Sequence, residues 1–560
     1  MPDDPQPLSR PSDDSVLRLY SSVAKRPVPF TPADPARVTF YTCGPTVYDD
    51  AHIGNFRSFL AADLLARFLA SPLCAVTGPD GNRHAGPREV HHVVNITDVG
   101  HMTDDDNADG CGDDKMALAG QRLLEAKKSG KLPDGVDIDP RDPAAIAGFY
   151  LDRFIEDAAM LGLRVAERAK RDPAMRPRLL PRATEHVDRM RDVIARLLER
   201  GAAYAAGEPG ARAIYFDTWF YQPYGIVSGN PTGDLLHGAG GRVDDAQQCE
   251  KRHPTDFLLW KEDGSHLMTW PAPRAPQTAG WGPGYPGWHI ECTAMSLWAF
   301  AHSGRDPFAP RDDLPNSPPI DLHSGGEDNI FPHHECENAQ TCVLLKTERA
   351  VGHWFHPRFL LVEGAKMSKS KGTVYTPREL FAQGHEPAAV RLALIQTNYR
   401  VNADFSVRSL ADAARQIDRW RAFADRAASG AEGPETPGQR ERFARALHDD
   451  LNVSATLGML NLWMKDTGWP TTGDARLLAD LDEVLGLLSL PRLEREDSAV
   501  GVYLPGAAPS DAIEALLRER AQARKAKDFA RSDEIRDELA AMGLAIRDVA
   551  GGKVEIAPSA

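Results

Sequence analysis

Four residues with metal-binding side chains lie far apart in the chain: Cys43 in YTCG, Cys292 in WHIEC, and His333 and Glu337 in PHHECE. Together they offer two thiolates, one imidazole and one carboxylate, a donor set suited to tetrahedral zinc. Pro332 fits the first turn of a helix, and His333 and Glu337 would then share one face of that helix. The residues alone leave three interpretations open: a zinc that takes part in chemistry, a structural zinc closed by four protein ligands, and no metal.

The number and spacing of the seven cysteines do not indicate a disulfide framework. The full set is Cys43, Cys74, Cys111, Cys249, Cys292, Cys336 and Cys342. An odd, sparse set in a long chain is typical of metal binding or of inert burial. Cys336 and Cys342 are rival ligands near Glu337, but Cys336 would point to a different face of the helix. We interpret both as small buried apolar side chains.

The segment HIGN, residues 52–55, has side chains that suit phosphate. It stands where an apolar-periodic run begins, and a helix N-terminus attracts phosphate through its N–H groups and its dipole. At that position His52 and Asn55 can donate to a phosphate oxygen, while Gly54 lets the backbone approach closely. A four-residue match also arises by chance, so HIGN alone is weak evidence.

The segment KMSKS, residues 366–370, places Lys366 and Lys369 three residues apart beside hydroxyl side chains. Alone it has an ordinary alternative, a solvated basic loop. Together with HIGN, in this order and far apart in one chain, it resembles the paired signatures of class I aminoacyl-tRNA synthetases. A third stretch, DLHSGGEDNIFPHH, carries Asp328 after two glycines, and such a carboxylate can hold ribose hydroxyls. The alternative for that stretch is a turn before a helix.

The elements that must position these residues indicate a doubly wound α/β domain. Val38 and Phe40 alternate with polar residues and predict a strand. From Phe56 to Phe68 apolar residues recur at helical spacing, so HIGN opens a helix, and a second strand is predicted at residues 90–96. This strand, loop and helix unit is typical of a Rossmann-type parallel sheet.

Further along, the pattern changes twice. Residues 143–161 and 181–201 predict helices, and AIYFDT predicts a strand, within an insertion that divides the α/β domain. After KMSKS the chain predicts helices at residues 406–428, 439–465 and 474–488, a helical bundle. The tail predicts two helices, 511–527 and 528–542, and a hairpin around Gly551-Gly552.

These patterns divide the chain into seven parts. They are the first half of the catalytic α/β domain at 20–114, a connective insertion at 115–280, the second half of the catalytic domain at 281–355, a KMSKS and stem-contact region at 356–405, a helical-bundle tRNA-binding domain at 406–493, a linker at 494–510, and a small α+β anticodon-recognition tail at 511–560. The tRNA roles in this division follow from the resemblance described next.

Over nearly its whole length the chain resembles the cysteinyl-tRNA synthetases of class I. The matching stretches are YTCGPTVYDDAHIGNFRSF, NITDVGH, PRATEHV, KRHPTDFLLWK, PGWHIECTAMS, HSGGEDNIFPHHECENAQ, KMSKS, DDLNVSATL and RKAKDFARSDEIRDEL. Two stretches depart from the simplest family pattern, extra loops near residues 77–89 and 104–114. A third departure is Asn55, which stands where the HIGH signature ends in histidine and which cannot carry a positive charge.

The resemblance implies a role for each matching residue. The implied zinc ligands are Cys43, Cys292, His333 and Glu337; the implied catalytic residues are His52, Asn55, Lys366 and Lys369; ATP binding is implied for His52, Gly54, Asn55, Asp328 and Lys369, and cysteine binding for Gly44, Thr46, Thr97 and Trp288. It also implies one zinc per chain, magnesium with ATP, and L-cysteine, ATP and cysteine tRNA as partners.

The implied reaction has two steps. The cysteine carboxylate attacks the α-phosphate of ATP to give cysteinyl-adenylate and pyrophosphate, and the terminal ribose hydroxyl of the tRNA then takes the cysteinyl group. Serine differs from cysteine by oxygen for sulfur, so shape discriminates poorly, and zinc prefers the thiolate. Two alternatives remain: a cysteine:amino-sugar ligase of mycothiol synthesis, which should lack the helical bundle and tail, and a noncatalytic tRNA-binding paralogue, which should have damaged signatures.

The bulk composition of the 560 residues, 42% hydrophobic and 26% charged, is that of an ordinary soluble protein. A net charge of −15 gives no argument for nonspecific nucleic-acid binding, although local basic patches can still bind tRNA. The polar, proline-rich start MPDDPQPLSRPSDD does not resemble a signal peptide, and no stretch has the length of a membrane span. We therefore expect a cytoplasmic protein, without membrane partners, that acts as a monomer.

Overall fold

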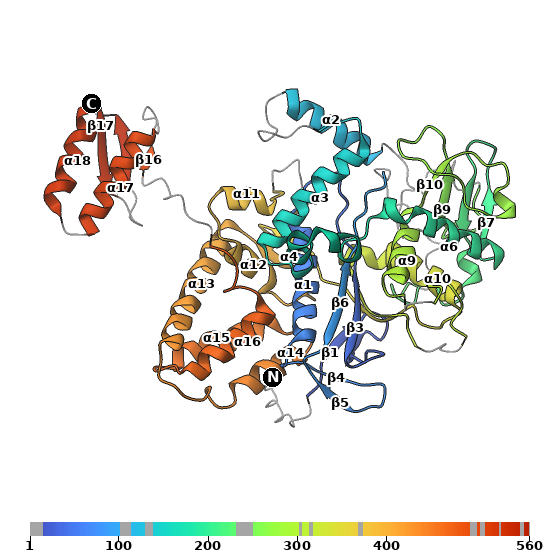
Figure 1. The fold of residues 1–560 in the computed structure, drawn as a ribbon, viewed down its shortest axis with the longest axis horizontal. Helices are drawn as coiled ribbons and strands as arrows, with labels where there is room; N and C mark the ends of the chain where they lie inside the picture. The colour runs from blue at the N-terminus through green and yellow to red at the C-terminus, as the bar shows by residue number, and fades with distance from the viewer. Residues whose placement is uncertain are drawn as a thin grey trace, which may run out of the picture. The chain divides into compact units, whose positions relative to one another are not determined.

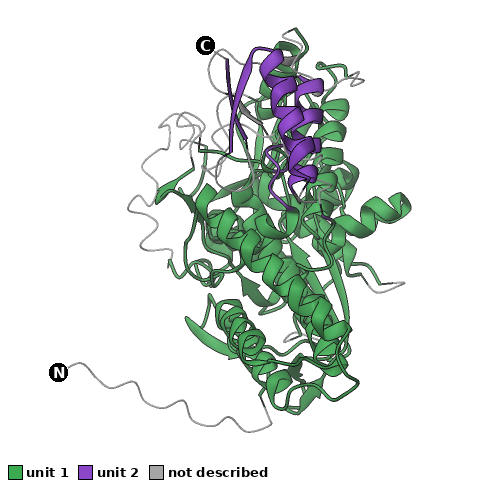
Figure 2. Ribbon diagram, turned by 90° about the vertical axis from the view of Figure 1, so that its left-hand side faces the viewer, with its two compact units in different colours: residues 1–380, 387–491 green, residues 381–386, 492–560 purple. Residues whose placement is uncertain are grey.

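The computed structural model describes residues 15–100, 114–128, 138–230, 250–301, 305–312, 317–367, 373–492, 501–503, 510–525, 528–548 and 554–558. They form two compact units (Figure 2). The first comprises the described residues of Met1–Leu380 and Pro387–Pro491, and the second those of Phe381–Glu386 and Arg492–Ala560.

The centre of the first unit is a four-stranded parallel sheet. Its strand order is β12 (Val351–Phe355), β11 (Ile320–Ser324), β3 (Arg37–Thr42) and β6 (Glu89–Val94). Val38 and Phe40 are both buried, as their alternation predicted. Helix α1 (Ile53–Ala70) connects β3 to the rest of the sheet and runs beside β6 (Figure 1). The predicted Rossmann-type α/β class is confirmed.

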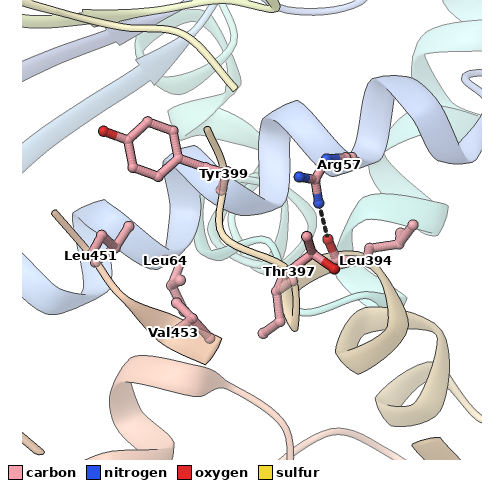
Figure 3. A pocket seen from close by; sticks show the side chains of 9 residues that line it. Arg57, Leu64, Leu394, Thr397, Tyr399, Leu451 and Val453 are labelled. Carbon is pink, nitrogen blue, oxygen red and sulfur yellow. Dashed lines mark hydrogen bonds between the residues drawn. The ribbon is translucent and has the colours of Figure 1, made fainter. Parts of the chain in front are cut away.

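Helix α1 is attached to the chain that follows the sheet through one buried side chain. The guanidinium of Arg57 donates four hydrogen bonds to backbone carbonyls, and the acceptors are Arg358, Leu394, Asn398 and Val401. Beside it lies a small apolar pocket, shown in Figure 3, between α1, α12 (Pro387–Ile395) and residues 451–453. Because all four of these hydrogen bonds go to backbone carbonyls within residues 358–401, Arg57 attaches α1 to that part of the chain.

The insertion contains helices and one antiparallel sheet. The helices are α2 (Lys115–Lys128), α3 (Pro143–Met160), α4 (Arg164–Arg171), α5 (Arg176–Leu179) and α6 (Val187–Glu199), and the sheet has the order β10 (Gly284–Pro286), β9 (Phe257–Glu262), β8 (Ala213–Phe216) and β7 (Ala203–Ala206). The helix predicted at 181–201 is shorter than expected, because a 3₁₀ turn at Ala183–His186 precedes α6. Two further helices return the chain to the parallel sheet, α9 (Trp288–Ala299) and α10 (Glu335–Leu345).

A helical bundle follows α12, as predicted. It contains α13 (Val407–Ala428), α14 (Gln439–His448), α15 (Val453–Asp466) and α16 (Thr472–Leu485). The single helix predicted for 439–465 is wrong, since the chain breaks between α14 and α15. Asp450 and Leu451 there have φ of 56° and 51°, a left-handed conformation that a continuing helix excludes.

The remaining elements of the first unit are short. They are β1 (Arg18–Ser21) with β2 (Arg26–Pro29), β4 (Ala75–Thr77) with β5 (Arg83–Ala85), a small sheet of β14 (Ala365–Lys366), β13 (Leu360–Val362) and β15 (Ala403–Phe405), and helix α11 (Pro377–Ala382), whose last two residues are counted with the second unit. The extra loop near 77–89 therefore forms most of the β4–β5 hairpin.

The second unit has its own core. Helices α17 (Asp511–Lys525) and α18 (Phe529–Ala541) accompany a sheet with the order β16 (Gly501–Tyr503), β18 (Val554–Pro558) and β17 (Leu544–Asp548). Its core residues are Ile513, Leu517, Ile535, Leu539, Leu544, Val554 and Ile556. The predicted β17–β18 hairpin is present, and β16 comes from the stretch predicted to be linker only. Within the described ranges, no helix is both long and apolar enough to span a membrane.

Candidate active site

The candidate site lies at one edge of the parallel sheet, where ligands bind in folds of this class. Cys43 follows β3, Asn95 follows β6, Gly325 follows β11 and His356 follows β12. The Gly44 N–H donates to Asn95 Oδ1 at 2.7 Å, and a Cβ at Gly44 would overlap the Asn95 carbonyl. Only glycine therefore fits beside Cys43.

Three of the four predicted metal ligands meet at this edge. Cys43 Sγ lies 3.9 Å from Cys292 Sγ, and His333 Nε2 lies 3.3 Å from Cys292 Sγ. Two sulfurs held at about 2.3 Å by one tetrahedral zinc are about 3.8 Å apart, so the two thiols already have the spacing that the metal requires. The three ligand atoms lie within 4.8 Å of one another, and all three side chains are buried.

Glu337 lies close to His333 and His334. A carboxylate oxygen of Glu337 forms a group with His333 and His334 in which the ligand atoms lie within 4.8 Å of one another. Both of its carboxylate oxygens accept from His323 Nε2, at 3.0 and 3.1 Å. Glu337 therefore joins the cluster because it lies near His333, and its hydrogen bonds to His323 fix the orientation of its carboxylate.

His334 is a candidate ligand that the sequence prediction missed. Its Nε2 lies 3.3 Å from Cys43 Sγ, and its Nδ1 lies 2.8 Å from His356 Nε2. Phe331 is the non-helical residue of the short turn that leads into α10 (Glu335–Leu345), so Pro332 lies in the first helical turn after this kink, as predicted. The two consecutive histidines reach different thiols, His333 that of Cys292 and His334 that of Cys43. The two adjacent histidines of PHHECE are the sequence feature that could have indicated this second imidazole ligand.

The two thiols share their protons unequally. Burial opposes ionisation of Cys43, but the hydrogen bond from Cys292 and the positive charge of His333 outweigh it and lower the pKa of Cys43 to about 5. The pKa of Cys292 is raised well above its usual value, first by its hydrogen bond to Cys43 and then by burial. The two buried sulfurs therefore share one proton. A bound metal cation would favour the form in which both are thiolates.

The residues predicted to bind cysteine surround this cluster. Trp288 stacks on the ring of His333, with centroids 4.6 Å apart. Thr97 Oγ1 donates to Glu291 Oε2 at 3.3 Å, next to Cys292, and Thr97 pairs with Thr46 in an isolated parallel bridge. With Gly44 directly after Cys43, the structure brings all four predicted pocket residues together.

The two nucleotide signatures also meet. The Met367 side chain of KMSKS lies against Gly54 of HIGN, so closely that a Cβ at Gly54 would overlap it. The Ile53 N–H donates to the Tyr375 carbonyl at 2.9 Å. The stretches on both sides of residues 368–372 therefore contact the first turn of α1. Lys369 itself lies outside the described residues.

Two predicted nucleotide residues lie at the surface. Lys366 is exposed, with its Nζ 4.9 Å from the centre of the Phe359 ring. Asp328 is also exposed and follows β11 at the same edge of the sheet, with its carboxylate folded over Gly326. Both positions are open to a ligand that approaches this edge.

The two rival cysteines are buried, as predicted. Cys336 has no exposed surface and lies 3.4 Å from the Tyr224 hydroxyl, and Cys342 is 3% exposed. Burial raises the pKa of both thiols. Neither belongs to a group of metal-ligating side chains in the described part of the chain.

The chain resembles known protein families and solved structures over most of its length. A family model described as the tRNA synthetases class I (C) catalytic domain matches residues 29–108 and 148–415, and the cysteinyl-tRNA ligase anticodon binding domain matches residues 508–554. The chain is 36% identical to a cysteine–tRNA ligase of Salinibacter ruber, covering 96% of this chain and 97% of the relative. It is 38% identical to the cysteine–tRNA ligase of Methylocella silvestris, covering 96% and 98%. A leucyl-tRNA synthetase of Agrobacterium radiobacter K84, solved with tRNA and LeuAMS, shares the fold, with a TM-score of 0.51 at 12% identity over 95% of this chain and 97% of that chain.

Proposed function

The chain belongs to the cysteine–tRNA ligases, a family of class I aminoacyl-tRNA synthetases, and from this premise we propose how its residues perform the ligation. The enzyme is an ATP-dependent ligase that joins L-cysteine to tRNA. The observation that carries the proposal is the Cys43–Cys292 pair at 3.9 Å beside His333, at the sheet edge where HIGN begins its helix.

One zinc ion is held by Cys43, Cys292 and His333, with Glu337 as the fourth ligand. The donor chemistry supports this set, because buried thiols and imidazoles at this spacing suit tetrahedral zinc. His323 holds the Glu337 carboxylate and keeps it oriented. Bound there, zinc supplies a preference for the substrate thiolate over the hydroxyl of serine. His334 is the rival to Glu337 as fourth ligand, since its Nε2 lies near Cys43 Sγ.

The cysteine pocket is formed by Gly44, Thr46, Thr97 and Trp288. Trp288 excludes water from one face of His333, and its stacking holds that ring in place. Thr97 and Glu291, joined by a hydrogen bond, place polar groups beside Cys292, where the amino group of the substrate needs an acceptor. A polar rim around a thiol-binding centre is consistent with a small zwitterionic substrate.

ATP lies along the first turn of α1, and magnesium accompanies it. His52, Asn55 and the backbone at Gly54 face the phosphates, Asp328 holds the ribose, and the lysines at 366 and 369 neutralise charge on the leaving pyrophosphate. Such reactions depend mostly on positioning and on charge stabilisation, which fixed donors supply. The carboxylate of cysteine attacks the α-phosphate, the bond to pyrophosphate breaks, and the terminal tRNA ribose then displaces AMP from the adenylate.

The parts after the catalytic domain recognise tRNA: residues 356–405 contact the stem, the helical bundle at 406–493 binds the body of the tRNA, and 511–560 recognise the anticodon. Two arginines of α17 form ion pairs within the second unit and therefore contribute little to a tRNA-binding surface. Arg520 is buried and pairs with Asp548, which also pairs with Arg524. Arg547 is exposed on β17 and remains a candidate contact.

Two rival functions fit less well. The amino-sugar ligase should lack the region after KMSKS, whereas this chain matches an anticodon-binding domain at residues 508–554. A noncatalytic paralogue should have lost its signatures, whereas His52, Gly54, Lys366 and Lys369 are all present.

Cysteine-dependent ATP–pyrophosphate exchange, with serine in place of cysteine as control, tests the proposal. Exchange with cysteine and none with serine supports the thiol-selective site. Equal exchange with both amino acids, or none with cysteine, contradicts it. The amino-sugar acceptor of mycothiol synthesis, offered in place of tRNA, distinguishes the amino-sugar ligase.

A further inference from the structure

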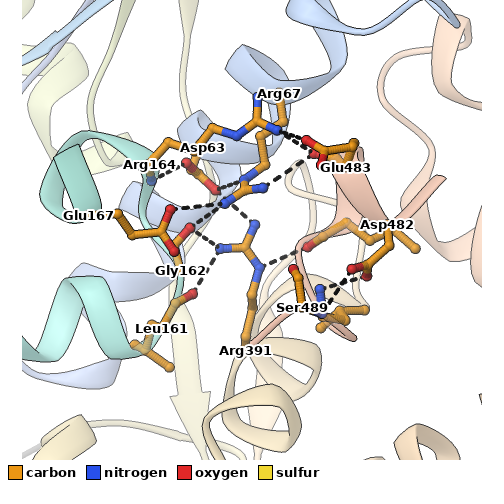
Figure 4. A network of polar contacts seen from close by, with 12 residues as sticks. Asp63, Arg67, Leu161, Gly162, Arg164, Glu167, Arg391, Asp482, Glu483 and Ser489 are labelled. Atoms are coloured by element: carbon orange, nitrogen blue, oxygen red, sulfur yellow. Dashed lines mark hydrogen bonds and ion pairs between the residues drawn. The ribbon is translucent and has the colours of Figure 1, made fainter. Parts of the chain in front are cut away.

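A buried charged junction lies in the second half of α1, away from the candidate active site (Figure 4). We define it by Asp63, Arg67 and Arg391, which are 0%, 6% and 0% exposed. Asp63 Oδ2 accepts from Arg67 Nε at 2.7 Å and from Arg391 Nη2 at 2.8 Å. Its other oxygen accepts the Arg164 N–H at 2.9 Å. One carboxylate therefore joins two guanidinium groups and the start of α4.

The two arginines also bind the ends of two other helices. Carbonyls in the last turn of a helix have no partner within it, and they must be satisfied from outside. Arg391 donates to carbonyls at the ends of α3 and α16, and Arg67 does the same. The acceptors are Leu161 and Gly162 after α3, and Glu483 and Leu485 at the end of α16.

The junction therefore joins four elements that are distant in sequence. Arg67 and Asp63 belong to α1, Arg391 to α12, and the carbonyls to α3 and α16. Helix α1 opens at His52, eleven residues before Asp63, which is about 17 Å along the helix axis. A rigid helix of this kind transmits the direction of the bundle helix α16 to the HIGN end.

The charges make this junction sensitive to geometry. Burial alone would raise the pKa of Asp63, but the two guanidinium groups outweigh it and hold that pKa well below its usual range. Buried ion pairs are favourable only when the donors and acceptors are well aligned. These hydrogen bonds need good alignment of donor and acceptor, so they restrict the angles at which the helices can pack.

We propose that Arg391 and Arg67, acting through Asp63, are positioning residues for transfer of cysteine to tRNA, because they fix the helical bundle against the helix that opens with HIGN. This inference rests on the proposed function, in which the bundle binds the tRNA body. A tRNA held on a tilted bundle presents its terminal ribose in the wrong place. Formation of cysteinyl-adenylate needs no tRNA, so it does not depend on the tilt.

The test separates the two steps in full-length variants. Arg391→Lys keeps the charge but cannot reach all its carbonyls, Arg391→Met removes the donors, and Arg67→Lys is the equivalent change on α1. Single-turnover transfer from preformed adenylate at saturating tRNA should fall by about tenfold or more, because a misplacement of about 1 Å can cost about a hundredfold in rate. Cysteine-dependent pyrophosphate exchange should stay within about twofold of the wild type.

A control variant lies at the antiparallel sheet of the insertion, outside the parts assigned to tRNA and to the active site. Arg212 pairs there with Glu262. Arg212→Met should leave both steps unchanged. Should the Arg391 and Arg67 variants fail to fold, Arg164→Ala removes only a half-exposed side chain that pairs with Glu483, and it should lower transfer by a smaller factor with exchange intact.

Equal loss of exchange and transfer in these variants would show that the junction only supports the fold, and would overturn the proposal. Transfer at the wild-type rate in the folded Arg391 variants would also overturn it. Absence of cysteine-dependent exchange in the wild type is a different result. It contradicts the proposed function and does not test the role of the ion pairs.

Discussion

His52 and Asn55 cap each other at the start of α1. The Asn55 N–H donates to His52 Nδ1 at 3.2 Å, and the His52 N–H donates to Asn55 Oδ1 at 3.1 Å. Because Nδ1 accepts a hydrogen bond, the ring carries its proton on Nε2, which then is the donor for a phosphate. An amide provides the acceptor that this reciprocal cap requires, which gives Asn55 a structural role where histidine is usual.

Substitutions at residue 55 separate the cap from the charge. Asn55→Asp keeps an acceptor for the His52 N–H but adds a negative charge beside the phosphates, so pyrophosphate exchange should fall sharply with little change in stability. Asn55→Ala removes one of the two reciprocal bonds, that from the His52 N–H to Asn55 Oδ1, and should cost about 1 kcal/mol in urea unfolding. Its exchange rate should fall less than that of Asn55→Asp. Similar exchange rates in the two variants would show that residue 55 does not face the phosphates.

The metal assignment predicts that Cys292→Ser loses zinc and cysteine activation while it keeps its fold. Serine is close in size, but its hydroxyl binds zinc weakly. Metal content by mass spectrometry and circular dichroism check the two expectations. Cys336→Ala is the matched control, because this thiol is equally buried but contacts Tyr224 and lies outside the cluster. Full zinc occupancy in Cys292→Ser would refute the assignment, and zinc loss in Cys336→Ala would point to another ligand set.

Lys369 is expected to stabilise charge that develops on the phosphates during adenylate formation. Lys369→Ala should lower the rate constant of activation in pre-steady-state kinetics much more than it weakens cysteine binding, the pattern of a transition-state contact. Lys465→Ala, which removes an exposed lysine from α15, serves as the control. An unchanged activation rate in Lys369→Ala would end this role.

Acid should destabilise the enzyme through buried neutral histidines. Burial, with the positive charges of Arg83 and Arg88, lowers the pKa of His448 to about 4, and its Nε2 accepts the Ala75 N–H at 2.8 Å. Between pH 6.5 and 4 the unfolded chain binds a proton there and the folded chain does not. Stability is therefore complete above pH 6.5 and is lost as the pH falls, by about 3 kcal/mol for this group.

His448→Gln isolates that contribution. The glutamine amide can accept the Ala75 N–H and does not titrate, so urea unfolding should depend less steeply on pH between 6.5 and 4 than in the wild type. Some acid sensitivity should remain, because His92 and His353 are also buried with pKa values lowered to about 4. The same pH dependence in the variant and the wild type would contradict the assignment to His448.

The sequence predicted the parts of the site that depend on local pattern. The β3 strand, the helix after HIGN and the burial of Cys336 follow from alternation, helical spacing and composition, which act within one element. The roles of His334 and His323 do not, because they arise from contacts with Cys43 and Glu337, which lie on other elements. Periodicity assumes a regular element and therefore assigned only one histidine of the pair.

The same reason explains the missed junction and the divided helix. Asp63, Arg67 and Arg391 look like surface charges in the sequence, since nothing local shows that α3 and α16 end beside them. The break between α14 and α15 comes from two residues of left-handed backbone, neither of them glycine. Tertiary hydrogen bonds stabilise it: the Asp450 carboxylate accepts from the Tyr20 N–H and the Tyr399 hydroxyl.

Removal of the second compact unit tests where anticodon recognition lies. A chain that ends at residue 492 loses all three strands of the small sheet, α17 and α18, whose core is formed by residues of that unit (Figure 2). Cysteine-dependent pyrophosphate exchange should be nearly unchanged, since the thiol cluster and both signatures are in the first unit. Transfer to cysteine tRNA should be sharply weaker, mainly because a higher tRNA concentration is needed to saturate the enzyme.

A point variant makes the same test without truncation. Arg547 is exposed on β17, so Arg547→Glu should weaken transfer through repulsion of the phosphate backbone while the unit stays folded. Arg520→Glu is not a suitable substitute, because Arg520 is buried against Asp548 and its loss would disturb the fold. If the truncated chain lost exchange and transfer equally, the second unit would be needed for the catalytic domain to fold. If Arg547→Glu also transferred at the wild-type rate, the anticodon contacts would have to lie elsewhere.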